Sequence, residues 1–342
     1  MSTLKNVFYE NMLTKAMTLP SVYGSAAPKT NAADLRTKGY EIVVSWKDGF
    51  KLAGKDFTYS VAGSLGDYKT TITKYDNPTN LLSDHYVGKV LGDIWGYTTD
   101  GLFATDEDAA AYAAQVNDKN ANKGVYAGKA PYNKLMAGDI KYVDVDGSGA
   151  IDTGANTLDD PGDRKIIGNT NPRYNYSLRG DFQWMGIDFQ MFLQGVGKVS
   201  WMPAANCIYF WNTYSYHRPT FIPKDFEAKC WSDEEGADNS DVLYPRRRGR
   251  MSASSYLVTS DYWLQDASYI RLKNLTVGYT LPLKTKAVEK VRFYFSGENL
   301  WYWSPMKKWT TAVDPEVATT SAYGDCLYPY AKTFSFGVDI TF

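Results

Sequence analysis

The sequence predicts an all-β protein that forms a portion of an antiparallel transmembrane β-barrel, and three observations lead to this fold class. Several segments of about ten residues alternate apolar and polar side chains, and a tilted strand needs this length to cross a bilayer. Short turns and very long loops alternate between the segments. Aromatic residues make up 15% of the 342 residues, and barrels concentrate such residues in girdles at both membrane interfaces.

Eight segments carry the strand pattern, with short turns after the second, fourth and sixth of them and long loops after the others, so they predict three tight hairpins. They span about residues 4–10, 40–47, 57–65, 173–184, 187–194, 268–281, 291–298 and 331–342. We expect tight turns at Asp48-Gly49 and at Met185-Gly186, because these dipeptides lie between two alternating runs. In the segment 268–281, Ile270 and Leu272 are out of phase with the residues that follow, so we expect a β-bulge there.

Composition excludes several other classes. No stretch approaches the roughly 18 consecutive apolar residues of a membrane helix, which excludes helical spans only. The net charge of -1 gives no reason to expect a nucleic-acid partner. Residues 1–13 lack the features of a signal peptide, so the export signal is expected outside this chain.

The cysteines give no metal signature. Cys207, Cys230 and Cys326 show no CxxC spacing, and with only two histidines a structural zinc site is not expected. A disulfide between Cys207 and Cys230 and free thiols both stay open.

The first long loop, about residues 69–172, contains one helix signal and one candidate metal loop. Thr105 precedes three acidic residues and an alanine-rich run, which is typical of an N-cap and a helix start. Residues 144–152 resemble a calcium-binding loop. The oxygen ligands expected from this pattern are Asp144, Asp146, Ser148 and Asp152. Ala155 stands where such loops carry a bidentate glutamate, so an ordinary Asx/Gly-rich turn is the competing interpretation. Ca²⁺ is the single cofactor that the sequence suggests.

The second long loop, about residues 197–267, is rich in aromatic residues. Rings of this kind suit stacking against sugars or peptide side chains. The candidate substrate-binding residues are Trp201, Tyr209, Trp211, Tyr214 and Tyr216. The competing interpretation is that these rings pack a small core for the loop itself. A third loop, about residues 304–330, precedes the closing strand.

Several short motifs follow one another in an order that is specific to one family. They are NAADLRTKGYE at 31–41, GDIWGY at 92–97, GDIKYVDVDG at 138–147, IIGNTNP at 166–172, WLQDASYIRLKNLTVGYTLP at 263–282, GENLW at 297–301 and the terminal Phe342. Together they resemble the carboxyl-terminal part of the SusC/RagA family of TonB-linked outer-membrane proteins of Bacteroidetes. The resemblance spans nearly the whole chain.

The resemblance implies a fold and a function. It implies that the eight strands are part of a larger plugged barrel of about 22 strands, with the plug domain outside this chain. It marks Phe342 as a carboxyl-terminal signal for membrane insertion. It further implies a transporter in the cell outer membrane that imports glycans or peptides, with a SusD-like surface lipoprotein as partner and the TonB complex as energy source.

A stand-alone small outer-membrane barrel, or a surface-binding or adhesin module without transport, is the alternative. If eight strands closed by themselves, side chains would fill the interior and no nutrient could pass. An enzyme is not expected, because the two histidines lie in separate loops and offer no triad spacing.

Overall fold

An antiparallel sheet of eight strands is the main element of the computed structural model, which describes residues 2–15, 24, 28–116, 134–204, 207–211, 214, 222–247, 258–283, 287–318 and 329–342. Its strands are, in spatial order, β1 (Ser2–Lys15), β2 (Lys29–Leu52), β3 (Lys55–Lys74), β8 (Arg173–Trp184), β9 (Ile187–Lys198), β12 (Tyr269–Pro282), β13 (Lys290–Trp303) and β14 (Thr333–Thr341). The strands correspond one to one to the eight predicted segments, so the predicted all-β, antiparallel fold class is confirmed.

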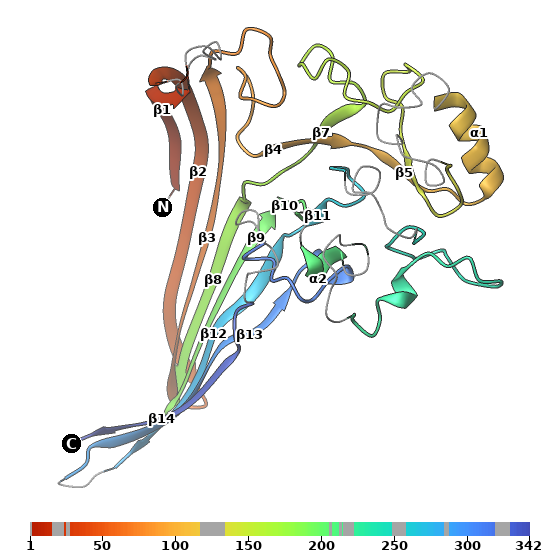
Figure 1. Ribbon diagram of the computed structural model, residues 1–342. Helices are drawn as coiled ribbons and strands as arrows, with labels where there is room; N and C mark the ends of the chain where they lie inside the picture. Colours follow the sequence, from red (N-terminus) through yellow and green to blue (C-terminus); the bar gives the residue numbers. More distant parts are fainter. Residues whose placement is uncertain are drawn as a thin grey trace.

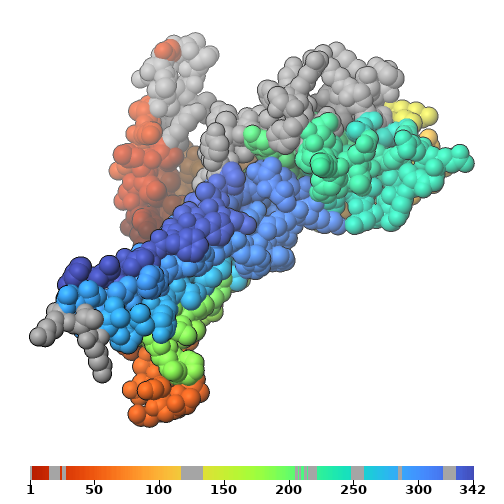
Figure 2. All heavy atoms as spheres, turned by 90° about the horizontal axis from the view of Figure 1, so that it is seen from below, coloured from red at the N-terminus to blue at the C-terminus, as the bar shows by residue number. Residues whose placement is uncertain are grey.

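Short turns and long loops lie at opposite ends of this sheet, which we name the turn end and the loop end. Figure 1 shows the strands side by side, with the carboxyl terminus at the turn end and α1 among the loops at the other. Seen from the turn end, the strands follow one another across the sheet in chain order from β3 to β14 (Figure 2). β1 and β14 form its two edges.

The first tight turn lies five residues beyond its predicted position. Asp48 and Gly49 are paired within β2, opposite Tyr59 and Thr58, and the turn is formed by Ala53 and Gly54. Ala53 and Gly54 have φ angles of 52° and 74°, which fits a type I′ hairpin turn. The prediction was therefore wrong at this turn. The second turn, at Met185-Gly186, is confirmed, with φ angles of 50° and 85°.

The strand register gives the sheet one apolar and one polar face. In β2 and β3, Ile42 lies opposite Leu65 and Trp46 opposite Val61. Side chains that lie directly opposite each other on neighbouring strands point to the same face of the sheet. The apolar row therefore continues through Phe182 and Phe189, which lie opposite each other in the hairpin β8-β9. Many of these side chains are exposed, Trp46 by 62%, as is expected for a surface that faces lipid.

The height of this apolar face fits a bilayer. On β2 the row runs from Tyr40 to Leu52, with Asp48 as its one polar member near the turn end. At the usual rise per residue this is about 40 Å of strand, and a tilt of about 45° reduces its height to about 28 Å. None of the helices in the described part of the chain is long and apolar enough to cross a membrane.

The loops carry small elements of their own. Two-stranded sheets pair β4 (Asp93–Tyr97) with β7 (Arg164–Asn169), β5 (Thr99–Leu102) with β6 (Ile140–Tyr142), and β10 (Ser200–Trp201) with β11 (Gln265–Asp266). The helices are α1 (Asp106–Val116), α2 (Ile208–Trp211) and two 3-10 turns, Glu227–Lys229 and Pro305–Lys308. The Thr105 hydroxyl accepts the N–H of Asp108 at 3.1 Å, which confirms the predicted N-cap of α1.

Two further details bear on the predictions. The register of β12 shifts between Leu272 and Asn274, so the predicted bulge is confirmed. β3 continues to Lys74, whereas the first long loop was expected from about residue 69. Cys207 and Cys230 are both buried and form no disulfide with each other, while Cys326 lies outside the described residues.

Candidate functional site

The polar face of the sheet is the first candidate site, because it joins side chains from all parts of the chain. Hydroxyl groups bridge neighbouring strands across it: Ser64 contacts Ser177 at 2.7 Å, and Thr276 contacts Ser296 at 3.2 Å. The Ser60 hydroxyl donates to the Asp181 carboxylate at 3.0 Å. These bonds satisfy polar groups within the sheet and leave a hydrophilic wall on the side opposite the apolar face.

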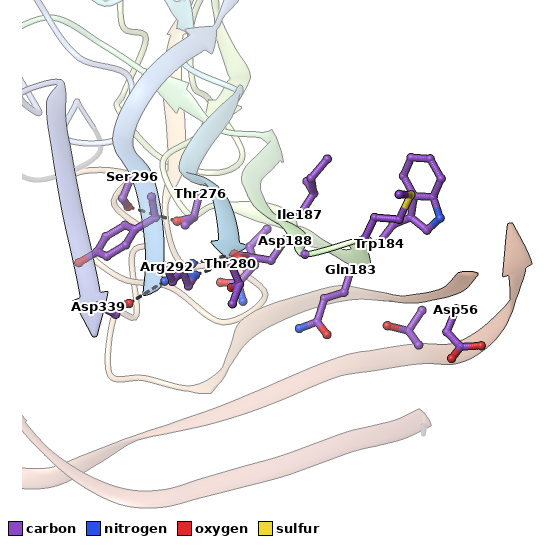
Figure 3. A pocket seen from close by; sticks show the side chains of 15 residues that line it. Asp56, Gln183, Trp184, Ile187, Asp188, Thr276, Thr280, Arg292, Ser296 and Asp339 are labelled. Atoms are coloured by element: carbon purple, nitrogen blue, oxygen red, sulfur yellow. Dashed lines mark hydrogen bonds and ion pairs between the residues drawn. The ribbon is translucent and has the colours of Figure 1, made fainter. Parts of the chain in front are cut away.

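A hollow of about 840 Å³ lies on this wall near the turn end (Figure 3). Figure 3 shows that polar side chains from β3, β8, β9, β12, β13 and β14 converge around it. The polar groups lining it include Thr58, Gln183, Asp188, Gln190, Thr276, Thr280, Arg292, Ser296 and Asp339. This chemistry suits hydrated or hydrogen-bonding material rather than lipid.

Arg292 organises the charges of this hollow. From β13 its guanidinium donates two hydrogen bonds to Asp188 on β9, at 2.9 and 2.7 Å, and one to Asp339 on β14 at 3.1 Å. The two parallel bonds to Asp188 are the strong bidentate arrangement of arginine with a carboxylate. The group thus joins three strands, and one of its partners lies near the end of the closing strand.

A glycine on the intervening strand makes this ion pair fit. Gly278 on β12 lies opposite both Asp188 and Tyr294. A Cβ atom at this position would lie 2.4 Å from an Asp188 carboxylate oxygen and 2.8 Å from the Arg292 Nε. The sequence pattern placed Gly278 among the polar positions of its strand, but only the structure shows that it makes room for an ion pair.

The aromatic residues predicted to bind substrate are placed within the core of their own loop. Trp211 is fully buried, and Trp201 and Tyr214 are 8% and 3% exposed. Trp211 packs edge-on against Trp263 at 4.7 Å between ring centroids, and Tyr214 stacks on Tyr244 at 5.4 Å. Additional strands or domains can only reduce the exposure of these rings. The packing therefore favours the competing interpretation, a loop core, for these three residues.

The other two predicted residues differ from them. Tyr209 is half-buried and packs at the border of this loop core, where its carbonyl accepts the Thr310 hydroxyl at 3.2 Å. Tyr216 lies outside the described residues. Phe342, the predicted insertion signal, follows β14 at the turn end and is 86% exposed.

The loop core also receives residues that the sequence did not indicate. Trp309 stacks on Phe210 at 5.6 Å, and Met306 and Val313 are each 2% exposed. All three come from residues 304–318, which follow β13 and which we name the strap. The second and third long loops therefore form one packed unit at the loop end of the sheet.

A buried ion-pair cluster fixes the strap to the sheet, and it was missed in the sequence. The Arg271 guanidinium on β12 pairs with Asp314, and the two side chains are 1% and 2% exposed. Arg271 also approaches Glu316 at 3.1 Å, and Glu316 pairs with Lys273 at 2.7 Å. The partners are 43 residues apart in the chain, so no local pattern could have indicated the pairing.

The predicted calcium loop brings together part of its expected ligand set. Asp144 and Asp146 lie with Asp163, each offering a carboxylate oxygen within 4.8 Å of the others. Asp163 was missed in the sequence, although it closes the motif Asp159-Asp-Pro-Gly-Asp163 a short distance downstream. In contrast, the Asp152 carboxylate accepts the N–H of Gly154 at 2.7 Å, and the Ser148 hydroxyl donates to the Ala150 carbonyl at 3.1 Å.

The protonation of this cluster depends on burial. Asp163 is fully buried, and desolvation raises the pKa of its carboxyl group although the N–H groups of Asp152 and Val145 donate to it. The N–H and hydroxyl of Ser148 lower the pKa of Asp146. Three carboxylates are a suitable beginning of a Ca²⁺ site, which takes six to eight oxygen ligands. The same hydrogen bonds also describe an Asx turn, so both interpretations fit the residues present.

No family model matches the chain. Two TonB-dependent receptors of Formosa agariphila, P3 and P26, are 26% and 21% identical to it over 95% and 98% of its length. The chain spans only 30% and 32% of these relatives.

Solved structures share the fold. The RagAB peptide transporter matches with a TM-score of 0.61 and 16% identity, and the RagAB peptide importer in an open-open state with 0.65 and 15%. The matches cover 100% and 98% of this chain but only 33% and 32% of those chains. The resemblance to part of a SusC/RagA-type TonB-dependent receptor is thus confirmed. The relatives are receptors and transporters, in agreement with the expectation of a protein that is not an enzyme.

Proposed function

We propose that this chain forms part of the wall and the extracellular loops of a TonB-dependent outer-membrane transporter that imports glycans or peptides. A SusD-like surface lipoprotein is the proposed partner at the loop end. The TonB complex is the proposed energy source and would act through a part of the protein outside this chain. The polar face lines the transport path, and the apolar face contacts lipid.

The observation that carries this proposal is the strand register. Seven strands, from β2 to β14 in the sheet order, keep their main apolar row on one face and their mainly polar row on the other, and on β2 the apolar row has a height that matches a bilayer. A soluble sheet of this size would cover its apolar face with a second layer. Here Val44 and Trp46 are 64% and 62% exposed instead.

The edges of the sheet support a larger assembly. In lipid, the unpaired N–H and C=O groups of an edge strand each cost several kcal/mol. β1 and β14, the two edges of this sheet, therefore need partners. Additional strands of the same barrel would supply them and would also leave a lumen wide enough for a plug and a transport path.

The size of the native polypeptide tests this proposal first. An antibody against residues 197–267 would be used on native outer membranes, in an immunoblot. Because the relatives are about three times as long, a band of about three times 38.4 kDa is expected in the outer-membrane fraction. A band near 38.4 kDa, or one in the soluble fraction, would contradict a transporter and favour the stand-alone barrel or the binding module.

Uptake and partner binding form the second test. A strain that lacks the gene would be compared with a complemented strain, using fluorescent oligosaccharide and oligopeptide pools. Loss of uptake of one pool would identify the substrate class. An affinity-tagged receptor should co-purify with one surface lipoprotein in detergent. Unchanged uptake of both pools would show that the protein does not import either class.

A further inference from the structure

Basic side chains gather around the loop-end parts of β2, β3, β8 and β9. We name this group the basic patch. Its members are Arg36, Lys38, Lys69, Arg173 and Lys198. Lys38 of β2 lies directly opposite Lys69 of β3, and Arg36 lies opposite Thr71. Like charges that face each other across two strands are destabilising, and an anion bound between them would offset this repulsion.

The register places Lys38 and Lys69 on the lipid side. Lys38 continues the row of Tyr40 and Ile42 on β2, and Lys69 continues the row of Leu65 on β3, with no register shift between these positions. The apolar face ends at this level. The two ammonium groups therefore lie where the hydrocarbon of the outer leaflet gives way to its polar headgroups.

A pocket of about 380 Å³ adjoins the lysine pair. Its lining includes Lys69, Arg173 and Lys198 from three neighbouring strands. Asn169 and Asn171 add amide groups from the segment that enters β8. Three cationic side chains and the Asp93 carboxylate thus line the pocket, and arginine and lysine are the side chains that most often bind phosphate oxygens.

The local carboxylates leave a positive excess. Asp67 pairs with Arg173, and Asp93 accepts the side-chain amide of Asn169 at 2.8 Å. Among the residues that the structure describes, Lys38, Lys69 and Lys198 have no carboxylate within ion-pair distance. The Arg173–Asp67 pair is neutral, and the three lysines at and beside the pocket, set against the Asp93 carboxylate in its lining, leave an excess of two positive charges.

From this placement we propose that the basic patch binds the phosphate group of a lipid headgroup in the outer leaflet. The inference rests on the proposed membrane location of the apolar face. Basic groups next to a membrane surface attract anionic headgroups, with a contribution from each lysine. The binding would also offset the repulsion between Lys38 and Lys69 and so stabilise the rim of the sheet.

The test uses the complete polypeptide that carries this chain, purified in detergent. Three probes are titrated and followed by native mass spectrometry: phosphorylated lipid A, the same lipid A after removal of its phosphates, and inorganic phosphate. The variant is Lys38→Gln with Lys69→Gln. The matched control is Lys47→Gln, an exposed lysine that lies opposite Ser60 on the polar face of the same strand.

We expect wild type and Lys47→Gln to bind phosphorylated lipid A alike, and the double variant to bind it about thirtyfold more weakly. Equal binding of the dephosphorylated lipid, or equal binding by the double variant, would overturn the proposal. Binding of inorganic phosphate as tightly as the phosphorylated lipid would indicate a free-anion site and would also overturn it. Recovery of the protein from the outer membrane is scored separately, so loss of the proposed location is distinguished from loss of lipid binding.

Discussion

Replacing Arg271 by methionine should release the strap from the sheet. Methionine fills a similar volume but leaves the Asp314 carboxylate, which is 2% exposed, without its cationic partner. Glu316 keeps its contact with Lys273 at 2.7 Å and so stays paired. The change therefore leaves the Asp314 carboxylate without a cation and removes one of the two cations that contact Glu316.

The magnitude follows from the burial of the pair. Removing one partner of a buried ion pair costs about 3–5 kcal/mol, because the remaining charge is uncompensated. The strap can avoid this cost by opening and exposing Asp314 to water. The population of the open strap should then rise by about 100- to 4,000-fold.

Hydrogen exchange of the strap amides measures this opening. The N–H groups of Val317 and Ala318 donate to the Asp314 carbonyl at 3.1 and 3.0 Å, so they exchange only when the strap opens. In the Arg271→Met variant these two amides should exchange about 100- to 4,000-fold faster than in wild type, while the exchange rates of the β13 amides stay unchanged.

Two further variants decide the interpretation. Adding Asp314→Asn removes the buried charge but keeps the oxygen that accepts the Glu316 N–H at 3.0 Å, so it should restore slow exchange to most of its wild-type level. Lys308→Gln removes an exposed pair with Asp241 and should change exchange by less than about fivefold. Wild-type exchange rates in Arg271→Met, or fast exchange that persists in the double variant, would refute the reasoning.

Three other predictions concern the polar face, the loop core and the acidic loop. Gly278→Ala should lower the free energy of unfolding in urea by about 1–3 kcal/mol, because the added Cβ would contact the Arg292–Asp188 ion pair. The control Gly63→Ala should be nearly neutral, because the nearest atom to its Cβ would be 3.7 Å away. Equal effects of the two substitutions would show that Gly278 is not needed to make room for the ion pair. Trp211→Ala should lower the stability of the loops by about 3–5 kcal/mol, measured by limited proteolysis, because it removes a fully buried ring. If the variant instead kept intact loops but lost uptake, this would support stacking of Trp211 on the substrate. If the acidic loop binds Ca²⁺, terbium luminescence should show weaker cation binding in Asp163→Asn than in wild type. In wild type, cation binding should weaken as the pH falls through the raised pKa of Asp163, because protons compete with the cation. Binding that does not change with pH would exclude this carboxylate as a ligand.

The hairpin β8-β9 shows how much of the fold could be predicted. Its alternation, its strand length and its Met185-Gly186 turn are all local properties, and each was read correctly. The turn predicted at Asp48-Gly49 was wrong, because this favourable turn dipeptide is paired within a longer strand. Phe50 and Phe57 lie opposite each other at 5.0 Å between ring centroids, and this contact extends the hairpin to Ala53-Gly54.

The candidate sites depended on contacts between distant parts of the chain. Aromatic content pointed to the second long loop, but not to whether its rings face solvent or one another. Packing against Trp309, which comes from the strap, decided that they form a core. Asp163 joined the acidic loop for the same reason, because the chain folds back through intervening residues before it approaches Asp144.

The strands and their two faces could be predicted from the amino-acid sequence, because the alternation of side chains with a period of two is a property of each strand's own backbone. The alternation of short turns and long loops could be predicted as well, because it follows from the spacing of the strands along the chain. Which charges meet was decided by the tertiary structure: Arg292 pairs with Asp188 and Asp339, and Arg271 pairs with Asp314. It also left Lys38 and Lys69 without a carboxylate partner among the described residues. These pairings depend on register and on loop closure, which bring together residues far apart in the chain, and no local pattern records them.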